Sequence, residues 1–334
     1  MIYDCFTFFN ELDLLDIRLN VLKEVVDKFV LVEATRTFTN KSKELFYEKN
    51  KSRFSAFGDR IIHVVVDDFP TFKTPWHNES HQRNAILRGL MDAQPNDLIL
   101  IGDIDEIPSP DLVTRHSSDP GISVFKQAYY SYYLNYRNAR QRWWYGTKML
   151  SFHDFSHVFD GVKTTYSDLL PQEVNEGTTP SKIRMLTPPR KKAKTRIIPN
   201  GGWHFTNLGG AENLLLKMRS FSHQEYNPSG EGIPVSQLSG MIERGEGPFW
   251  RMRCFAEPLD ATYPLYLREN AARYASLIFP VSDDYIRKHR MQKIWHTSIG
   301  SIIVFCERAI PSSLHNFLHM CKVRIRRLRE ANRD

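Results

Sequence analysis

The sequence has few cysteines, no long apolar run and no internal repeat. Its four cysteines form no C-x-x-C pair and no tight cluster with histidine, which excludes the usual pattern of a structural zinc site. The longest late apolar run, around residues 299–306, is well short of the ~20 residues that a membrane-spanning helix needs. The opening MIYDCFTFFNELD carries acids where a secretory signal begins with basic residues, so we expect a cytoplasmic protein without an integral membrane anchor.

What the chain does have is enough apolar sequence for a folded core and an excess of positive charge. Its 334 residues are 41% hydrophobic, which suits one large core or two modest ones. The net charge is +7, and much of the excess lies in residues 188–196 and 322–330. A basic protein can bind nucleic acid, anionic lipid or phosphorylated small molecules, and charge alone does not choose among these partners.

Short apolar runs rich in β-branched residues alternate with helical patterns in the first third of the chain. This alternation predicts an α/β fold with a mostly parallel central sheet and helices on both faces. The predicted strands are residues 2–8, 29–34, 61–66 and 98–102, and helical spacing of apolar residues covers 12–29 and 78–93.

The rest of the chain has a less regular pattern. Residues 122–134 and 148–153 are predicted to add strands to the sheet, and residues 211–223 to form a helix with one buried face. The basic, proline-rich segment 171–200 is predicted to be a solvated loop or flap. From about residue 265 the pattern is helical, so the fold is predicted to end in a helical C-terminal extension.

Acidic residues follow the ends of the predicted strands. In open α/β sheets ligands bind beyond the carboxyl ends of the strands, where Asn10, Glu11, Glu33 and Asp103 all fall. Asp103 and Asp105 are two residues apart, so on extended backbone both carboxylates project to the same side. Two converging carboxylates suit Mg²⁺ or Mn²⁺, which completes its shell with water and phosphate oxygens. The alternative is a solvated turn.

The helix before this strand carries Arg83 and Asn84 in the segment HQRNAILRGL. Both are predicted to bind the nucleotide cofactor, and Arg83 is placed to contact a nucleotide or phosphate through charge-assisted hydrogen bonds. The alternative is an arginine paired with Glu79 or Asp92 on the surface of the helix.

Several motifs in order resemble one family. The segments MIYDCFTFFNELDLLDIRLNVL, VDKFVLVEAT, QRNAILRGL, LILIGDIDEIP and GGWHFTNLGG resemble glycosyltransferase family 17, the family of the β-1,4-mannosyl-glycoprotein 4-β-N-acetylglucosaminyltransferase. The resemblance implies a GT-A (Rossmann-like) fold, a UDP-N-acetylglucosamine-type donor, Mn²⁺ or Mg²⁺, and inversion at the anomeric carbon. It also implies that Asn10 and Glu11 open the nucleotide pocket and that Glu33 touches the nucleoside.

The same resemblance suggests a division of the chain. Residues 1–260 form the predicted catalytic domain, with the nucleotide-sugar half at about 1–110 and the acceptor half at about 111–260. Residues 261–334 form the helical C-terminal region.

Inversion by single displacement needs a general base within reach of the acceptor hydroxyl. Glu212, at the start of a helix after a Gly-Gly turn, is the first candidate, although an acid there also compensates the helix dipole. His204 is a candidate metal ligand or diphosphate contact, with a structural histidine as the alternative, and Trp203 a candidate stacking wall for sugar or base. Further candidates for the base are Asp154, Asp160 and Glu173.

The dense aromatic segment 129–145 predicts either an acceptor groove or a hairpin with aromatic cross-strand pairs. The partners we expect are a nucleotide-sugar donor and a glycan acceptor that is lipid-linked or free, and not nucleic acid. The basic end of the chain is compatible with a peripheral membrane contact at the inner face. Two rival functions stay open: a non-catalytic module that binds glycans or nucleic acid, and a phosphohydrolase with Asp103 as nucleophile.

Overall fold

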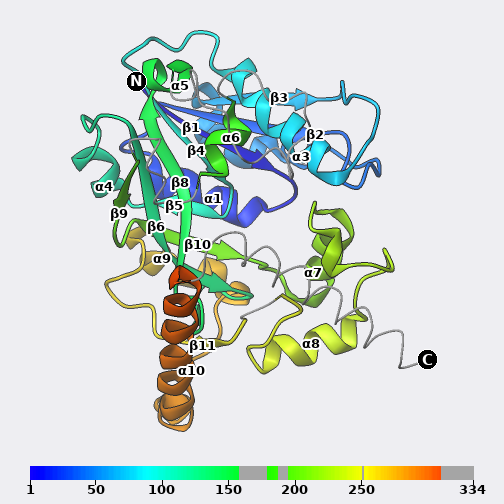
Figure 1. Cartoon of the computed structure of the whole chain (residues 1–334), viewed down its shortest axis with the longest axis vertical. Coiled ribbons are helices and arrows are strands. Elements are labelled where there is room, and N and C mark those ends of the chain that lie inside the picture. Colours follow the sequence, from blue (N-terminus) through cyan, green and yellow to red (C-terminus); the bar gives the residue numbers. More distant parts are fainter. Residues whose placement is uncertain (158–178, 187–194, 250–251, 310–334) are drawn as a thin grey trace.

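The computed structural model describes residues 1–157, 179–186, 195–249 and 252–309, and Figure 1 shows their arrangement. A single curled sheet runs through the molecule in the order β11-β7-β6-β8-β4-β1-β2-β3, with β5, β9 and β10 attached beside it. Asp160 and Glu173, two candidates for the general base, lie outside the described residues. None of the described helices is both long and apolar enough to cross a lipid bilayer.

The N-terminal half of the sheet is parallel. Its strands stand in the order β3-β2-β1-β4, so β1 at the centre pairs with β2 on one side and with β4 on the other. The predicted α/β class, with the Rossmann-like half expected of a GT-A fold, is confirmed. Their bounds are Ile2–Phe8 (β1), Lys28–Ala34 (β2), Ile61–Val66 (β3) and Leu98–Asp103 (β4).

Helices cover both faces of this half, as predicted. One face packs against α1 (Leu12–Leu22), η1 (Lys51–Arg60) and α9 (Leu265–Glu269), and the other against α3 (Pro75–Asn84) and η2 (Ala85–Gly89). Two predicted bounds were wrong. The apolar spacing continues past Leu22 because Val26 and Phe29 fill the core from a turn and from β2, and the helix predicted at 78–93 starts at Pro75 and becomes 3₁₀ at Ala85.

Beyond β4 the sheet is mixed. β8 (Trp143–Ser151) runs antiparallel to both β4 and β6 (Ile122–Ser131), so the strand predicted at 148–153 begins earlier. The aromatic segment forms the predicted hairpin alternative, with β7 (Tyr136–Asn138) between β6 and β11 (Cys254–Ala256).

Two short strands attach the C-terminal motif to the end of β4. β5 (Glu106–Pro108) pairs antiparallel with β10 (Gly202–Thr206), and β10 also runs parallel to β6. In this register His204 stands opposite Glu106, although the two are almost a hundred residues apart in the chain.

The prediction of a solvated loop at 171–200 was wrong for the parts that the structure describes. α6 (Pro180–Arg184) has Pro180 to Ile183 buried, and β9 (Thr195–Ile198) pairs parallel with β6. The proline is the first residue of a short helix capped by Thr179, whose side chain accepts from Lys182 N, so its presence marks a helix start.

The remaining elements lie around the second half of the sheet (Figure 1). Tyr263, Leu267 and Tyr274 join the core beneath α1, so the C-terminal region begins inside the same packed body. The bounds are α2 Phe46–Lys49, α4 Pro110–Arg115, α5 Phe152–His157, α7 Gly210–Ser220, η4 Gln224–Tyr226, α8 Val235–Glu243, η5 Ala271–Leu277 and α10 Asp283–Ala309.

Gly202 should be intolerant of a side chain. Its φ is +126°, and a Cβ there would lie 2.2 Å from the carbonyl oxygen of Ile107 in the paired strand. We expect Gly202→Ala to lower the free energy of unfolding by more than the roughly 1–3 kcal/mol of a left-handed residue alone, because backbone must also move. Gly210→Ala is the matched control: its φ is +82° with nothing within 4 Å. Urea unfolding compares the two, and equal losses would contradict the clash.

Candidate active site

The candidate site lies at the carboxyl end of β4, around the turn that joins it to β5. Asp103 is the last residue of β4, Ile104 and Asp105 form the turn, and Glu106 opens β5. The predicted extended backbone through Asp105 is therefore a turn. The two aspartates are held by different partners in consequence.

A buried arginine fixes this turn. Arg18 of α1 is fully buried and forms a two-point ion pair with Asp4 of β1, Nε to Oδ2 and Nη2 to Oδ1, both at 2.7 Å. Its remaining Nη1 donates to the carbonyl oxygens of Asp103, Ile104 and Glu106 at 2.8, 3.1 and 2.9 Å. Arg18 thereby ties the first strand and helix to the turn. The sequence motifs gave no sign of this role.

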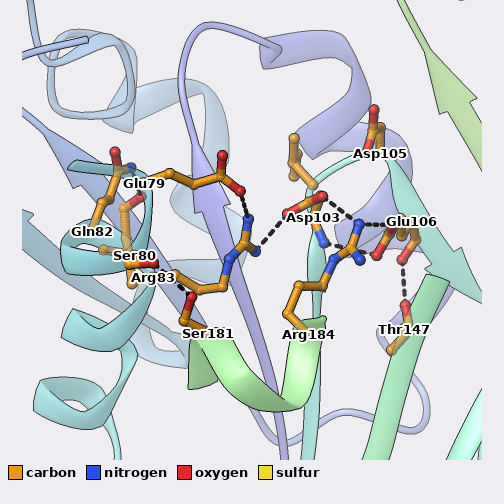
Figure 2. A network of polar contacts seen from close by, with 12 residues as sticks. Glu79, Ser80, Gln82, Arg83, Asp103, Asp105, Glu106, Thr147, Ser181 and Arg184 are labelled. Carbon is orange, nitrogen blue, oxygen red and sulfur yellow. Dashed lines mark hydrogen bonds and ion pairs between the residues drawn. The ribbon is translucent and has the colours of Figure 1, made fainter. Parts of the chain in front are cut away.

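Asp103 is clamped between two arginines (Figure 2). Arg83 Nη1 lies 2.6 Å from Oδ1, and Arg184 Nη2 lies 2.7 Å from Oδ2. Burial by itself raises the pKa of Asp103, but Arg184 and Arg83 together hold it far below its usual range. Arg83 also pairs with Glu79 at 2.9 Å, which the helix-surface alternative predicted, yet it is buried and reaches the candidate site as well.

Arg184 arrives from a distant part of the chain on α6. This short helix is docked on α3: Ser181 Oγ lies 3.0 Å from Ser80 Oγ, and Ser181 N donates to Asn84 Oδ1 at 3.1 Å. The amide oxygen of Asn84, predicted to contact nucleotide, is therefore used to anchor α6. Arg184 Nη2 also contacts Glu106 Oε1, while its buried Nε has no hydrogen-bond partner among the described residues.

Glu106 links the two halves of the site. Its side chain is fully buried, and Oε1 accepts from Trp144 Nε1 at 2.6 Å as well as from Arg184. Its other oxygen accepts from Asp103 N at 3.1 Å, and its main-chain oxygen accepts from Thr147 Oγ1 at 2.7 Å. Glu106 is the third acid of the DIDE sequence, and sequence reasoning missed it.

Asp105 faces the opposite way and meets β10 and α7. Its Oδ2 lies 3.3 Å from His204 Nε2 and 3.9 Å from Lys217 Nζ. Burial opposes the ionised form, but His204 and Lys217 lower the pKa of Asp105 to about 2. The His204 ring lies against Tyr129 and Trp144, with centroids 4.9 Å away on each, so its orientation is fixed.

Asp105 Oδ2 and His204 Nε2 are placed as two ligands of one divalent cation. Ligands at about 2.1 Å in octahedral geometry stand about 3 Å apart, which is close to the 3.3 Å between these two atoms. The described residues include no gathering of three or more His, Cys, Asp or Glu side chains around one point, so the protein would supply two ligands. Asp103, the third predicted ligand, has both oxygens held by arginine.

The strand-end residues predicted to line a nucleotide pocket differ in their surroundings. Glu33 is fully buried; its oxygens meet Lys43 Nζ at 3.7 Å and His63 Nε2 at 3.2 Å and accept from Tyr47 N. Direct contact with a nucleoside is therefore not available to Glu33 in this arrangement. Lys43 lies over the rings of Phe9 and Phe46, whose centroids are 5.3 and 5.6 Å from its Nζ.

The Asn10–Glu11 pair lies nearer the Asp105 side. Glu11 Oε2 accepts from the main-chain N of Phe9 and of Asn10, at 3.1 and 3.0 Å. Burial raises the pKa of Glu11, partly offset by Lys217, and the charge of Asp105 raises it further. Glu11 and Asp105 therefore share one electrostatic environment.

Trp203 is not brought to this site. It is the neighbour of His204 on β10, so its side chain points to the other face, where it joins the core and donates to Thr262 O at 2.8 Å.

Glu212 is exposed in the first turn of α7, the helix that also carries Lys217, and its role as general base stays a prediction. Asp154, which accepts from Gly121 N, lies in α5 past Ser151, which pairs with the start of β4, so it is far from the turn.

Comparison with known proteins finds similar sequences for the N-terminal half of the chain. The family model of Glycosyltransferase family 17 matches residues 1–161. The human and rat (Rattus norvegicus) β-1,4-mannosyl-glycoprotein 4-β-N-acetylglucosaminyltransferases are each 29% identical over 110 residues. That stretch is 30% of this chain and 21% and 20% of the relatives, so the match spans about a fifth of their length.

Solved structures show a weaker likeness. A mannosyltransferase from Pyrobaculum calidifontis in complex with GDP-Man and Mn²⁺ has a TM-score of 0.38 at 12% identity, covering 91% of this chain and 84% of that one. A glucosyl-3-phosphoglycerate synthase from Mycobacterium tuberculosis with Mn²⁺, UDP and glucosyl-3-phosphoglycerate has a TM-score of 0.33 at 12% identity, covering 80% and 91%. Scores this low carry no weight for the site.

The family resemblance rests on the N-terminal part of the chain. The resemblance to glycosyltransferase family 17 that the motifs indicated is confirmed over residues 1–161, just under half of the chain. Because the matched stretch is only about a fifth of the relatives' length, the activity of the whole protein belongs to the proposed function.

Removing Arg18 should be costly. Arg18→Met would leave Asp4 buried without its partner and three turn carbonyls without their donor, so we expect a loss of about 3–5 kcal/mol in the free energy of unfolding. Arg53→Met is the control, because Arg53 pairs with Asp13 in a partly exposed site and should cost at most about 1 kcal/mol. Urea titration measures both. Losses of equal size would show that the buried pair is not a structural anchor.

Asp105 should contribute stability that depends on pH. Its ionisation stabilises the folded state above the unfolded pKa near 3.8, and this is lost as pH falls toward about 2. We therefore expect the difference in free energy of unfolding between the native protein and Asp105→Asn to shrink by about 2 kcal/mol over that window. Urea titrations across the window measure the difference. In a His204→Gln background the pH dependence should be smaller; a difference that grows on acidification would contradict the pairing.

Proposed function

We propose that the protein is a metal-dependent, inverting glycosyltransferase that moves a sugar, N-acetylglucosamine, from a UDP-sugar to a glycan hydroxyl. The observation that carries the proposal is that the two aspartates have different partners. Asp103 holds the buried Arg83 and the largely buried Arg184, and Asp105 faces a histidine at a distance suited to one cation. A diphosphate needs both kinds of partner, since its negative charge grows as the sugar-phosphate bond breaks.

Arg83 and Arg184 would bind the diphosphate. Both guanidinium groups are oriented by Asp103, and Glu106 fixes Arg184 further. The Nε of Arg184 donates to no residue in the described part of the chain, and a phosphate oxygen would satisfy it. Because the arginines are already held by carboxylates, they lose little conformational freedom when the donor binds. Asp103 would then orient the two guanidinium groups and would not bind the metal ion itself.

Asp105 and His204 would hold Mn²⁺ or Mg²⁺. The cation, when bound, stabilises charge on the leaving diphosphate as a Lewis acid. Lys217 beside Asp105 adds a second positive charge near the same point. The aromatic rings of Tyr129 and Trp144 keep the imidazole of His204 in place and exclude water from one side of it.

The nucleoside would lie beyond β1 and β2. Lys43 lies over the rings of Phe9 and Phe46 and is held by the buried Glu33. Glu33 would then hold Lys43 and His63 in place and would not touch the nucleotide itself. The family resemblance supplies four further parts of the proposal. These are uracil as the nucleobase, N-acetylglucosamine as the sugar, inversion at the anomeric carbon, and Glu212 as the general base. The acceptor, lipid-linked or not, and the cytoplasmic location stay predictions.

The two rival functions have less support. A phosphohydrolase needs Asp103 as a free nucleophile, but both of its oxygens are engaged by arginine and its pKa is held low, which weakens it as a nucleophile. A non-catalytic binding module does not require an acid and a histidine fixed 3.3 Å apart at the end of a strand.

Calorimetry with UDP, with and without Mn²⁺, tests the assignment. Arg184→Gln should weaken UDP binding about 10–100-fold, because a charge-assisted hydrogen bond is lost while Arg83 still neutralises Asp103. Asp105→Asn should remove the part of the affinity that depends on Mn²⁺. The matched control is Arg196→Gln, which changes an exposed arginine paired with Asp119 outside the site and should leave binding unchanged.

Turnover identifies the donor. A screen of nucleotide sugars with Mn²⁺ should show slow hydrolysis of UDP-N-acetylglucosamine that both variants of the site reduce. Burst release of phosphate from a simple phosphoester would favour the phosphohydrolase. UDP binding that ignores Mn²⁺, Asp105 and Arg184 would overturn the proposal.

A further inference from the structure

The longest described helix, α10, packs against the other described residues through one face. Ala256 N of β11 donates to Tyr285 Oη at 3.1 Å, and Arg140 Nε donates to His296 Nδ1 at 3.2 Å. Gly300 lies so close to the main chain that a Cβ there would be 2.2 Å from the carbonyl oxygen of Arg140. These contacts fix which side of the helix faces the protein. In Figure 1 α10 runs from the end of the sheet along the edge of the molecule.

The opposite face carries large apolar side chains in the open. Met291 is 73% exposed, Ile294 51%, Trp295 59% and Ile302 61%. Positions 291, 294, 295 and 302 fall on one stripe of a helix, with Ser298 between them, because they recur at intervals of three, four and seven residues. We call these four side chains the α10 stripe. Exposed apolar residues scattered singly are normal, whereas an aligned set on one helix face marks a contact surface.

The charges around the α10 stripe are mostly positive, although two acids, Asp283 and Asp284, stand at the start of the helix and Arg287 pairs with Asp284 at 3.4 Å. Residues 285–302 include no aspartate or glutamate, and they carry four basic residues. Arg287, Lys288 and Arg290 are exposed beside the N-terminal end of the stripe, while Lys293 pairs with Glu257 on the protein side. An apolar face with tryptophan, flanked by arginine and lysine, is the pattern of a helix that lies in the interface of an anionic membrane.

We propose that α10 docks on an anionic lipid surface, with the α10 stripe entering the headgroup boundary and Arg287, Lys288 and Arg290 on the headgroups. A second copy of the chain is the other occupant to consider. Two such helices packed along their stripes would bring two strongly basic surfaces together, and like charges repel. Anionic headgroups instead attract both parts of the face. This surface goes beyond the transferase site and does not depend on it.

Vesicle co-sedimentation of the full chain tests the proposal. We expect binding to vesicles of phosphatidylcholine mixed with phosphatidylglycerol, and at least tenfold weaker binding to phosphatidylcholine alone. The double change Ile294→Ser and Trp295→Ser should reduce binding to the anionic vesicles at least tenfold. Changing Arg287, Lys288 and Arg290 to Gln should reduce it comparably and remove its salt dependence. Met91→Ser is the matched control, because Met91 is 83% exposed but lies between η2 and β4.

Circular dichroism and thermal unfolding check that each variant is folded, and Met291→Ser provides a milder second test of the stripe. Binding that is equal for both vesicle types, or that the stripe changes leave untouched, would overturn the proposal. So would light scattering that shows a dimer dissociated by Trp295→Ser in a protein that does not bind vesicles, since a second copy would then be the occupant. UDP binding by the same variants should be unchanged, which separates this test from that of the transferase site.

Discussion

The site depends on one buried arginine. Arg18 is matched in charge by Asp4, and the rest of its donors bind the carbonyl oxygens of the turn after β4. A guanidinium group remains charged inside a protein, so burial is tolerated only where all of its directions find acceptors. A turn that leaves three carbonyls pointing inward is tolerated only where a donor meets them. Each feature therefore requires the other, and together they fix the directions of Asp103 and Asp105.

This turn divides the acids between two different environments. Asp103 meets arginines from α3 and α6, whereas Asp105 meets His204 from β10 and Lys217 from α7. Both carboxylates are partly buried and both have lowered pKa values, so they are ionised at neutral pH. Glu106 connects the two environments, because the same carboxylate holds Arg184 and the indole of Trp144, whose ring lies against His204. A substitution near Asp103 is therefore expected to alter the surroundings of Asp105, and the reverse.

Sequence reasoning worked best where local pattern decides structure. The four parallel strands are marked by apolar runs that must be buried on both faces, so their positions were predictable to within a residue or two. Asp103 and Asp105 were found because they lie at or just past the end of a strand, and Arg83 because it lies in the helix that precedes that strand. It failed for Trp203, because two neighbours on a strand cannot face the same site, and for the segment 171–200, whose charge concealed the buried helix α6.

Arg18, Glu106, Trp144 and Arg184 were not predictable. Each acts through a partner from another part of the chain: Arg184 is about eighty residues from Asp103, and His204 about a hundred from Asp105. Hydrophobic periodicity is a property of neighbours in sequence and contains no information on such pairs.

The sequence by itself determined the alternation of strands and helices, the acids at the carboxyl ends of the strands and the likeness to one enzyme family. Only the tertiary structure decided which charge meets which. Parallel strands bring their ends to one edge whatever the loops do, but the pairing of β5 with β10 and the docking of α6 on α3 choose the partners of each carboxylate. Those contacts depend on distance in space, and electrostatic energy inside a protein falls with that distance and not with separation along the chain.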